Sequence, residues 1–235
     1  MQKIAIGLLL ATFLLSGSVS GYPTASIDQL DPTQPYLVVD LVYNFDVYER
    51  PLFFLPKAHP TFVVWLEDTD TGYRESIFVT RKAGKNKWNF ANRRPEAIPV
   101  WYGVNKIEKR QRSFDIDAVS GATPKDERAR IFWQIPHAYQ DKVVDVYIEA
   151  NNSFDFNDHY TRKKGTPGYS GANGQPSLVW KASLDFSQKN PQDVSPEIIG
   201  HGHLFGSNHR LFEDTSNITT AARTFQKISI SYVTP

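Results

Sequence analysis

Apolar residues in this chain alternate with polar ones at a spacing of two, and this pattern restricts its fold more than any other feature. Successive side chains of a β-strand point to opposite faces, so such alternation predicts strands with one buried face. The alternating segments are rich in Val, Ile, Tyr, Phe and Trp, whereas helical periodicity is scarce. The clearest segments are 37–44, 61–68, 75–82, 129–136, 143–151, 177–186 and 227–233.

Turn-forming sequences separate these segments. The segments 61–68 and 75–82 flank a glycine-containing turn at 70–72, which predicts a β-hairpin. Helices are expected only as short stretches, over 124–128 and 216–224. This pattern predicts an all-β fold, a single antiparallel β-sandwich that is immunoglobulin-like in outline. The expected core residues of the hairpin are Val63, Trp65, Ile77 and Val79.

The first 21 residues have the composition of a secretory signal peptide. Lys3 stands near the start, the apolar run that follows is too short to span a bilayer comfortably, and small residues precede Tyr22. Cleavage after Gly21 leaves residues 22–235 as a single domain, long enough to bury its own core. We therefore expect a protein that is periplasmic or secreted and that does not span the membrane after cleavage.

Charge and composition exclude several classes of function. The chain has 26 Lys and Arg and 25 Asp and Glu, a formal net charge of +1, so no electrostatic attraction to nucleic acid is expected. It has no Cys, which removes disulfides and thiol nucleophiles, and it has no G-x-S-x-G motif. Because no catalytic nucleophile is visible, the sequence favours a non-enzymatic role, and a metal-dependent enzyme that uses the histidines near the C-terminus is the third alternative.

Six segments, taken in order, resemble one known family. They are VVWLEDTDTGYRESIFVTRK, IPVWY, DAVSGATP, YIEANNSFDFNDHY, SGANGQPSLVWKASL and TSNITTAA. They resemble the periplasmic bacterial proteins catalogued as domain of unknown function 2271, over most of the chain that follows the leader. The resemblance implies an exported bacterial protein without an assigned activity. Genes of this family often accompany those of periplasmic flavin transferases and PepSY-type membrane proteins, so it also implies a redox setting with such partners.

A short motif within this stretch resembles the sequence at which periplasmic flavin transferases attach FMN. It consists of Asp117, Ser120, Gly121, Ala122 and Thr123, in the order D-x-x-S-G-A-T. The threonine hydroxyl would attack the pyrophosphate of FAD, and the small neighbours would let the transferase close over the backbone. The resemblance therefore implies a covalent FMN on Thr123 that carries electrons.

Thr123 also fits a purely structural role. Pro124 follows Thr123 directly, and Asp126 is the third residue after Thr123, so Thr123 can be the N-cap of a short helix. Such a cap contributes about 1 kcal/mol and needs no cofactor. The proline after the threonine also departs from the flavin motif, and the chain lacks the overall pattern of the FMN-binding domain that usually contains it.

The segment YIEANNSFDFNDHY offers a second candidate site. In an extended chain, alternate polar side chains would share one face: Glu149, Asn151, Ser153, Asp155, Asn157 and His159. Oxygen ligands at this density could hold Ca²⁺, and a His with an Asp could bind a transition metal. Alternate side chains of a strand lie about 7 Å apart, however, so they cannot converge on one ion without a bend. The alternative is the solvated face of a sandwich strand.

A third candidate lies near the C-terminus, where His201 and His203 precede a glycine-containing turn that could bring back His209. Three imidazoles can form a zinc site with one open position. Their spacing matches no strong zinc signature, and the alternative is a loop whose histidines bond locally.

Five tryptophans complete the candidate residues. They are expected mostly in the core, and Trp88 and Trp101, with Tyr102, are those expected near Thr123. Together these patterns predict an exported accessory protein of a membrane-linked redox system that carries FMN on Thr123. The alternative is a cofactor-free periplasmic module that binds a ligand or a partner.

Overall fold

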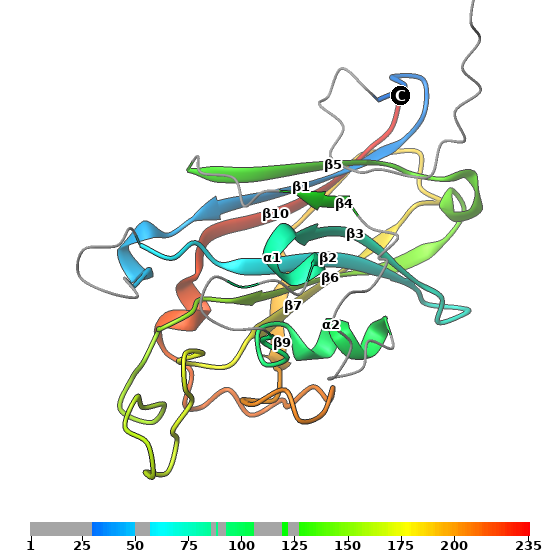
Figure 1. The fold of residues 1–235 in the computed structure, drawn as a ribbon. Helices are drawn as coiled ribbons and strands as arrows, with labels where there is room; N and C mark the ends of the chain where they lie inside the picture. The colour runs from blue at the N-terminus through cyan, green and yellow to red at the C-terminus, as the bar shows by residue number, and fades with distance from the viewer. Residues whose placement is uncertain (1–29, 50–56, 86–87, 89–92, 106–118, 122–126) are drawn as a thin grey trace, which may run out of the picture.

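The computed structural model describes residues 30–49, 57–85, 88, 93–105, 119–121 and 127–235, with the backbone alone for 119–121 (Figure 1). The predicted signal peptide lies outside the described residues. Asp117, Ala122 and Thr123 of the motif lie outside them too.

Two β-sheets pack face to face (Figure 1). Every pair of neighbouring strands is antiparallel except β3 and β4, which run parallel. The smaller sheet has the order β5 (Arg128–Gln134), β1 (Tyr36–Tyr43), β10 (Phe225–Val233) and β8 (Gln192–Val194). The larger has the order β4 (Val119–Gly121), β3 (Arg74–Thr80), β2 (Thr61–Asp68), β6 (Val143–Asn151), β7 (Leu178–Asp185) and β9 (Glu197–His201).

The helices of the described chain are short. They are α1 (Arg81–Gly84), α2 (Pro99–Val104) and the 3-10 turns η2 (Phe45–Val47), η3 (His137–Tyr139) and η4 (Thr220–Arg223). Within the described ranges, no helix has the length and the apolar character that a bilayer crossing requires. The predicted fold class, an antiparallel β-sandwich with only short helical turns, is thereby confirmed.

The predicted elements differ from the observed ones mainly at their ends. The strands over 61–68 and 143–151 are confirmed without change. The helix predicted over 216–224 forms only as the single turn η4, because β-branched residues such as Ile218 and Thr219 disfavour helix. The helix predicted over 124–128 lies mostly outside the described residues, and Arg128 already begins β5.

The hairpin of β2 and β3 is confirmed, and its four predicted core residues are all buried. They do not share one face, however. Ile77 is the extra residue of a β-bulge opposite Val64 and Trp65, so it turns into the core between the sheets. Val63, Trp65 and Val79 lie on the opposite, outer face of the larger sheet.

A second apolar cluster therefore covers part of the outer face. Trp101 and Ile98 of the α2 segment pack there with Trp65 and Val63, and all four are almost wholly buried. Figure 1 shows α2 on the side of the larger sheet that faces away from the smaller one. One stretch of this sheet is thus buried on both faces, and the candidate site lies beside α2.

The core between the sheets determines whether the sandwich folds. We expect Leu66→Ala, at a side chain with 0% exposure in β2, to lower the free energy of unfolding by about 2 to 5 kcal/mol, because it leaves a cavity. Tyr73→Ala, at a side chain with 61% exposure in the hairpin, is the control and should change it by less than about 0.5 kcal/mol. Equal losses in urea titrations would contradict this assignment of the core.

Candidate functional site

A buried carboxylate attaches α2 to the larger sheet. Glu149 of β6 has 0% exposure, and its Oε2 accepts a hydrogen bond from the Trp101 amide at 2.8 Å. Its Oε1 accepts from the Val100 amide at 3.2 Å and from the Ser177 hydroxyl at 2.6 Å. Burial raises the pKa of Glu149 to about 7, although these three hydrogen bonds favour its ionised form.

Local sequence explains why this helix needs an acceptor from another strand. Pro99 opens α2, and the N-cap residue Ile98 has no side chain that could accept from the free amides. The His209 Nδ1 lies 2.8 Å from the Pro99 carbonyl oxygen and secures the same end of the helix. Gly103 lets the two segments approach closely, because a Cβ there would lie 2.3 Å from the His209 Cβ.

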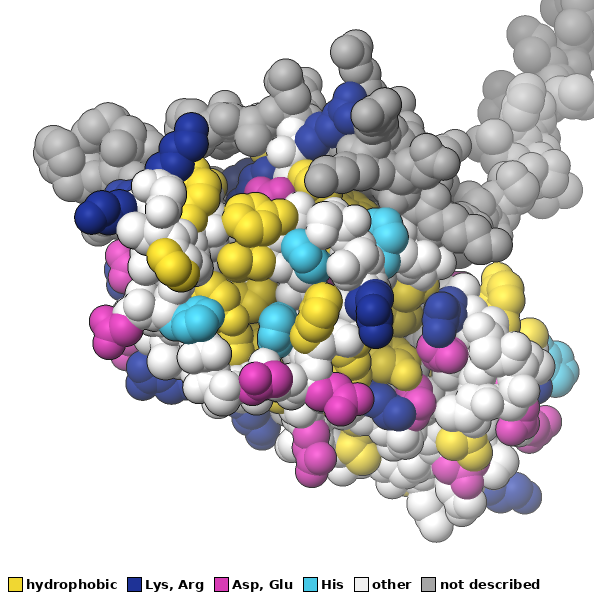
Figure 2. All heavy atoms as spheres, turned by 90° about the horizontal axis from the view of Figure 1, so that it is seen from below, with side chains coloured by type: hydrophobic (Ala, Val, Ile, Leu, Met, Phe, Trp, Pro, Cys, Tyr) yellow, Lys and Arg dark blue, Asp and Glu magenta, His cyan; other side chains and the backbone are white. Residues whose placement is uncertain are grey.

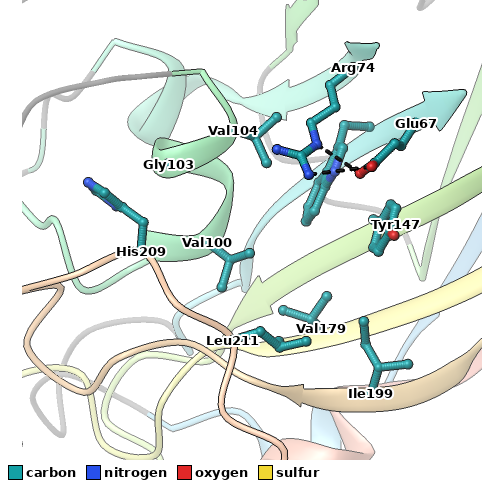
Figure 3. Close-up of a pocket in the computed structure, with 11 residues that line it drawn as sticks. Glu67, Arg74, Val100, Gly103, Val104, Tyr147, Val179, Ile199, His209 and Leu211 are labelled. Carbon is teal, nitrogen blue, oxygen red and sulfur yellow. Dashed lines mark hydrogen bonds and ion pairs between the residues drawn. The ribbon is translucent and has the colours of Figure 1, made fainter. Parts of the chain in front are cut away.

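A groove of about 420 Å³ opens beside α2 on the outer face of the larger sheet (Figure 3). Its floor is formed by one side chain from each of four strands: Trp65, Tyr147, Val179 and Ile199. One wall is α2, through Val100, Gly103 and Val104, and the other is formed by His209 and Leu211. In Figure 2 this side of the molecule shows a hydrophobic hollow with histidine side chains around it.

Stacked rings and ion pairs define the open end of the groove. The rings of Trp65 and Tyr147 lie 5.1 Å apart and are parallel within 5°. Lys181 lies 5.8 Å from the centre of the Tyr147 ring and also pairs with Asp145 at 2.8 Å. At the rim, Arg74 pairs with Glu67 at 2.7 Å (Figure 3). Each cation has an acidic partner, so the groove offers an apolar floor and a polar, locally neutral rim.

The polar segment predicted as one extended face is bent in the structure. The strand β6 ends at Asn151, and Phe154 adopts a positive φ of 67°, so that the chain turns away from the sheet. The prediction of a single polar face over 149–159 was therefore wrong, because a turn follows β6. Asn157 donates to the Asn217 carbonyl at 2.9 Å, and His159 is exposed on the loop.

The first residues of that segment are buried rather than solvated. Asn151 and Ser153 accept hydrogen bonds from the guanidinium of Arg94, at 3.4 and 2.6 Å. Arg94 also donates to Asn173 at 2.9 Å and pairs with Glu96 at 3.1 Å. This buried network joins the turn after β6 to the segment that leads into α2, and it gives those polar side chains a structural role.

Asp155 is buried in a separate place, against η4. One carboxylate oxygen accepts from the Thr220 hydroxyl, while Oδ2 has no partner among the described residues. Burial raises the pKa of Asp155 to about 6. Four members of the predicted set are therefore buried, and His159 is the exposed one: the buried ones are Glu149, Asn151, Ser153 and Asp155.

His201 and His203 bond locally, whereas His209 contacts the Pro99 carbonyl, 110 residues away in sequence. His201 Nδ1 lies 2.8 Å from the Gly202 carbonyl and its ring stacks on Phe212, while His203 accepts from the Phe205 amide at 3.1 Å. His209 lies at the groove wall. Across the residues that the structure describes, no three His, Cys, Asp or Glu side chains are placed to hold one metal ion.

The tryptophans are mostly core residues, as expected. Trp101, Trp133 and Trp180 are buried, and the Arg94 guanidinium lies 4.9 Å from the centre of the Trp88 ring. Among the five tryptophans, Trp65 is the one that lines the groove. Four further groove residues were not predicted from the sequence: Tyr147, Val179, Ile199 and Leu211. The available signal was a set of strands that are apolar on both faces, such as TFVVWLED.

Asp155 provides a test of the buried loop. Its raised pKa means that its contribution to stability is present below pH 4 and is lost as the pH rises through about 6. Relative to Asp155→Asn, the wild-type free energy of unfolding should therefore rise on acidification from pH 7 to pH 4, by on the order of 1 to 2 kcal/mol. Asp158→Asn, at an exposed site in the same loop, is the control for denaturant titrations at each pH. A pH-independent difference between wild type and Asp155→Asn would refute this.

No protein-family model, curated protein sequence or solved structure matches this chain. The groove beside α2 and the motif that continues from β4 are therefore the features from which a function can be inferred.

Proposed function

We propose that this protein is an exported, cofactor-free binding module whose groove beside α2 accepts a flat, largely apolar group. One observation supports this above all: four strands of the larger sheet turn apolar or aromatic side chains outward at one place, where a sandwich sheet ordinarily meets water. A hollow of about 420 Å³ with an apolar floor and a few polar groups at its rim has the size and character of a small-molecule site.

The rim sets the chemistry of the ligand. Arg74 at the rim pairs with Glu67, and Lys181, which lies next to the groove residue Tyr147, pairs with Asp145. A strongly charged ligand would therefore have to break an ion pair to bind. A neutral ring system with one or two carbonyl oxygens could lie on Tyr147 and Ile199 and still accept a hydrogen bond at the rim. Such ligands agree with the membrane-linked redox setting that the family resemblance implies.

The groove can be tested with menadione, a flat apolar quinone. We expect it to shift the methyl NMR signals of Val100, Val179 and Ile199, and we expect Ile199→Asp to weaken binding at least tenfold, because a carboxylate would replace part of the apolar floor. Val143→Asp makes the same change at an exposed site of β6 and should bind as the wild type does. If Ile199→Asp stays folded and keeps wild-type affinity, the groove is not the binding site.

Electron transfer by FMN on Thr123 is the second candidate function. What favours it is the position of the motif: Ser120 and Gly121 belong to β4, the outermost described strand of the larger sheet. Gly121 is paired with Thr80 of β3, and the other side of β4 has no described strand next to it. A transferase could approach such an edge without unfolding the sandwich.

Intact mass tests the flavin candidate. On co-expression with a periplasmic flavin transferase, we expect a gain of one FMN less one water, because the threonine hydroxyl displaces AMP from FAD. Thr123→Ala should abolish this gain, and Thr71→Ala, in the exposed β2–β3 turn, should retain it. An unmodified wild-type chain would exclude this function and leave the groove proposal unaffected.

A further inference from the structure

We propose that α2 is a pH-dependent wall of the groove: it is seated on the sheet while Glu149 is protonated, and its first turn is released when Glu149 ionises. This inference concerns the regulation of the site described above, and it rests on the proposed function only for its effect on binding. The attachment of α2 itself can be measured without a ligand.

Glu149 is buried without a cation of the described residues beside it. None of the ion pairs between described residues includes this carboxylate, and its three hydrogen-bond donors are the neutral groups of Val100, Trp101 and Ser177. An ionised carboxylate in such a place pays for lost hydration and gains only neutral hydrogen bonds in return. Exposure to water would relieve this cost.

The helix α2 shields the Glu149 carboxylate from water. Its first two amides sit directly on the carboxylate, and Val100 of the same turn lines the groove. Lifting this turn would hydrate Glu149 and move the groove wall at the same time. The Trp101 indole opposes complete detachment, because it is buried and donates to the Ser76 hydroxyl at 2.8 Å. We therefore expect a local opening of the first turn only.

The direction of the effect follows from linkage. The pKa of Glu149 is about 7 when α2 is seated and returns towards its ordinary value of 4.5 when the turn opens. The seated state therefore holds the proton more tightly, so acid favours seating and alkali favours opening. The opening equilibrium should rise steeply across neutral pH and level off above it.

Other titratable groups around α2 must be separated from Glu149. Tyr102 faces it from the helix itself, but burial raises the pKa of this phenol well above neutrality. Arg94 and Glu96, before the helix, pair with each other. His209 contacts the Pro99 carbonyl from the facing loop, and the Nδ1 of His201 contacts the Gly202 carbonyl. Of these groups His209 touches α2 directly, and it is therefore the necessary control.

Hydrogen exchange at the Val100 and Trp101 amides tests the proposal. After correction for the intrinsic exchange rate, the opening constant of both amides in the wild type should rise at least tenfold between pH 5 and pH 8. Glu149→Gln should abolish this rise, and His209→Asn, whose amide can still donate to Pro99, should keep it. The amide of Val64, in the core between the sheets, is the internal reference. A rise that persists in Glu149→Gln, or that disappears in His209→Asn, would overturn the proposal.

A second variant covers the case in which Glu149→Gln does not fold. The Ser177 hydroxyl stabilises the ionised carboxylate, so Ser177→Ala should raise the pKa of Glu149 further and move the midpoint of the opening curve to higher pH. An unchanged or lowered midpoint would count against Glu149 as the titrating group.

Menadione binding separates this inference from the proposed function. If the amide exchange depends on pH as described while menadione never binds, the pH-dependent movement of α2 is supported and the proposed binding function is refuted. If menadione binds in the groove while the amide exchange is independent of pH, the groove function stands and the pH-dependent wall falls.

Discussion

The attachment of α2 to the larger sheet depends on one carboxylate that has no contact with water. Glu149 occupies the outer face of β6, and through its two oxygens it holds the first turn of α2 and the start of β7. The second apolar cluster, which buries Trp65 and Trp101, requires α2 in this position. The groove lies beside the end of α2, on a part of the outer face that no other described segment covers.

Much of the fold could be predicted because its signals are local. Alternation over 129–136 or 227–233 is a property of each strand alone, and it identifies a sandwich before any pairing is known. The helix α2 has no comparable signal. Its partners Glu149 and His209 lie 48 and 110 residues away in sequence, and a six-residue segment that contains proline and glycine would not be stable as an isolated helix.

The candidate site was harder to predict because tertiary contacts decide which of its residues are buried and which are exposed. Alternating polar residues after β6 indicate a solvated face only if the strand continues, and the turn at Phe154 ends it. Arg94 then buries Asn151 and Ser153, which the sequence alone would leave in water. For the groove residues the difficulty is the reverse, because apolar side chains that the sequence alone would place in the core line a groove. A segment such as TFVVWLED is apolar on both faces, and nothing local distinguishes a central buried strand from the floor of a groove.

The chemistry of hydrogen bonding explains why an ionisable side chain occupies the outer face of β6. The N-cap residue of α2 is Ile98, which is wholly buried in the second cluster, so that position cannot also supply a polar cap. The acceptor has to come from the sheet, where three donors converge on one point: two amides and the Ser177 hydroxyl. An amide side chain would turn donors of its own towards them. A carboxylate has two acceptor oxygens and no donor when ionised, so it can accept from all three donors, but it then buries a charge that no cation of the described residues balances. This cost of burial outweighs the three hydrogen bonds, so the seated helix favours the protonated form of Glu149. Sensitivity to pH is therefore a consequence of how α2 is attached.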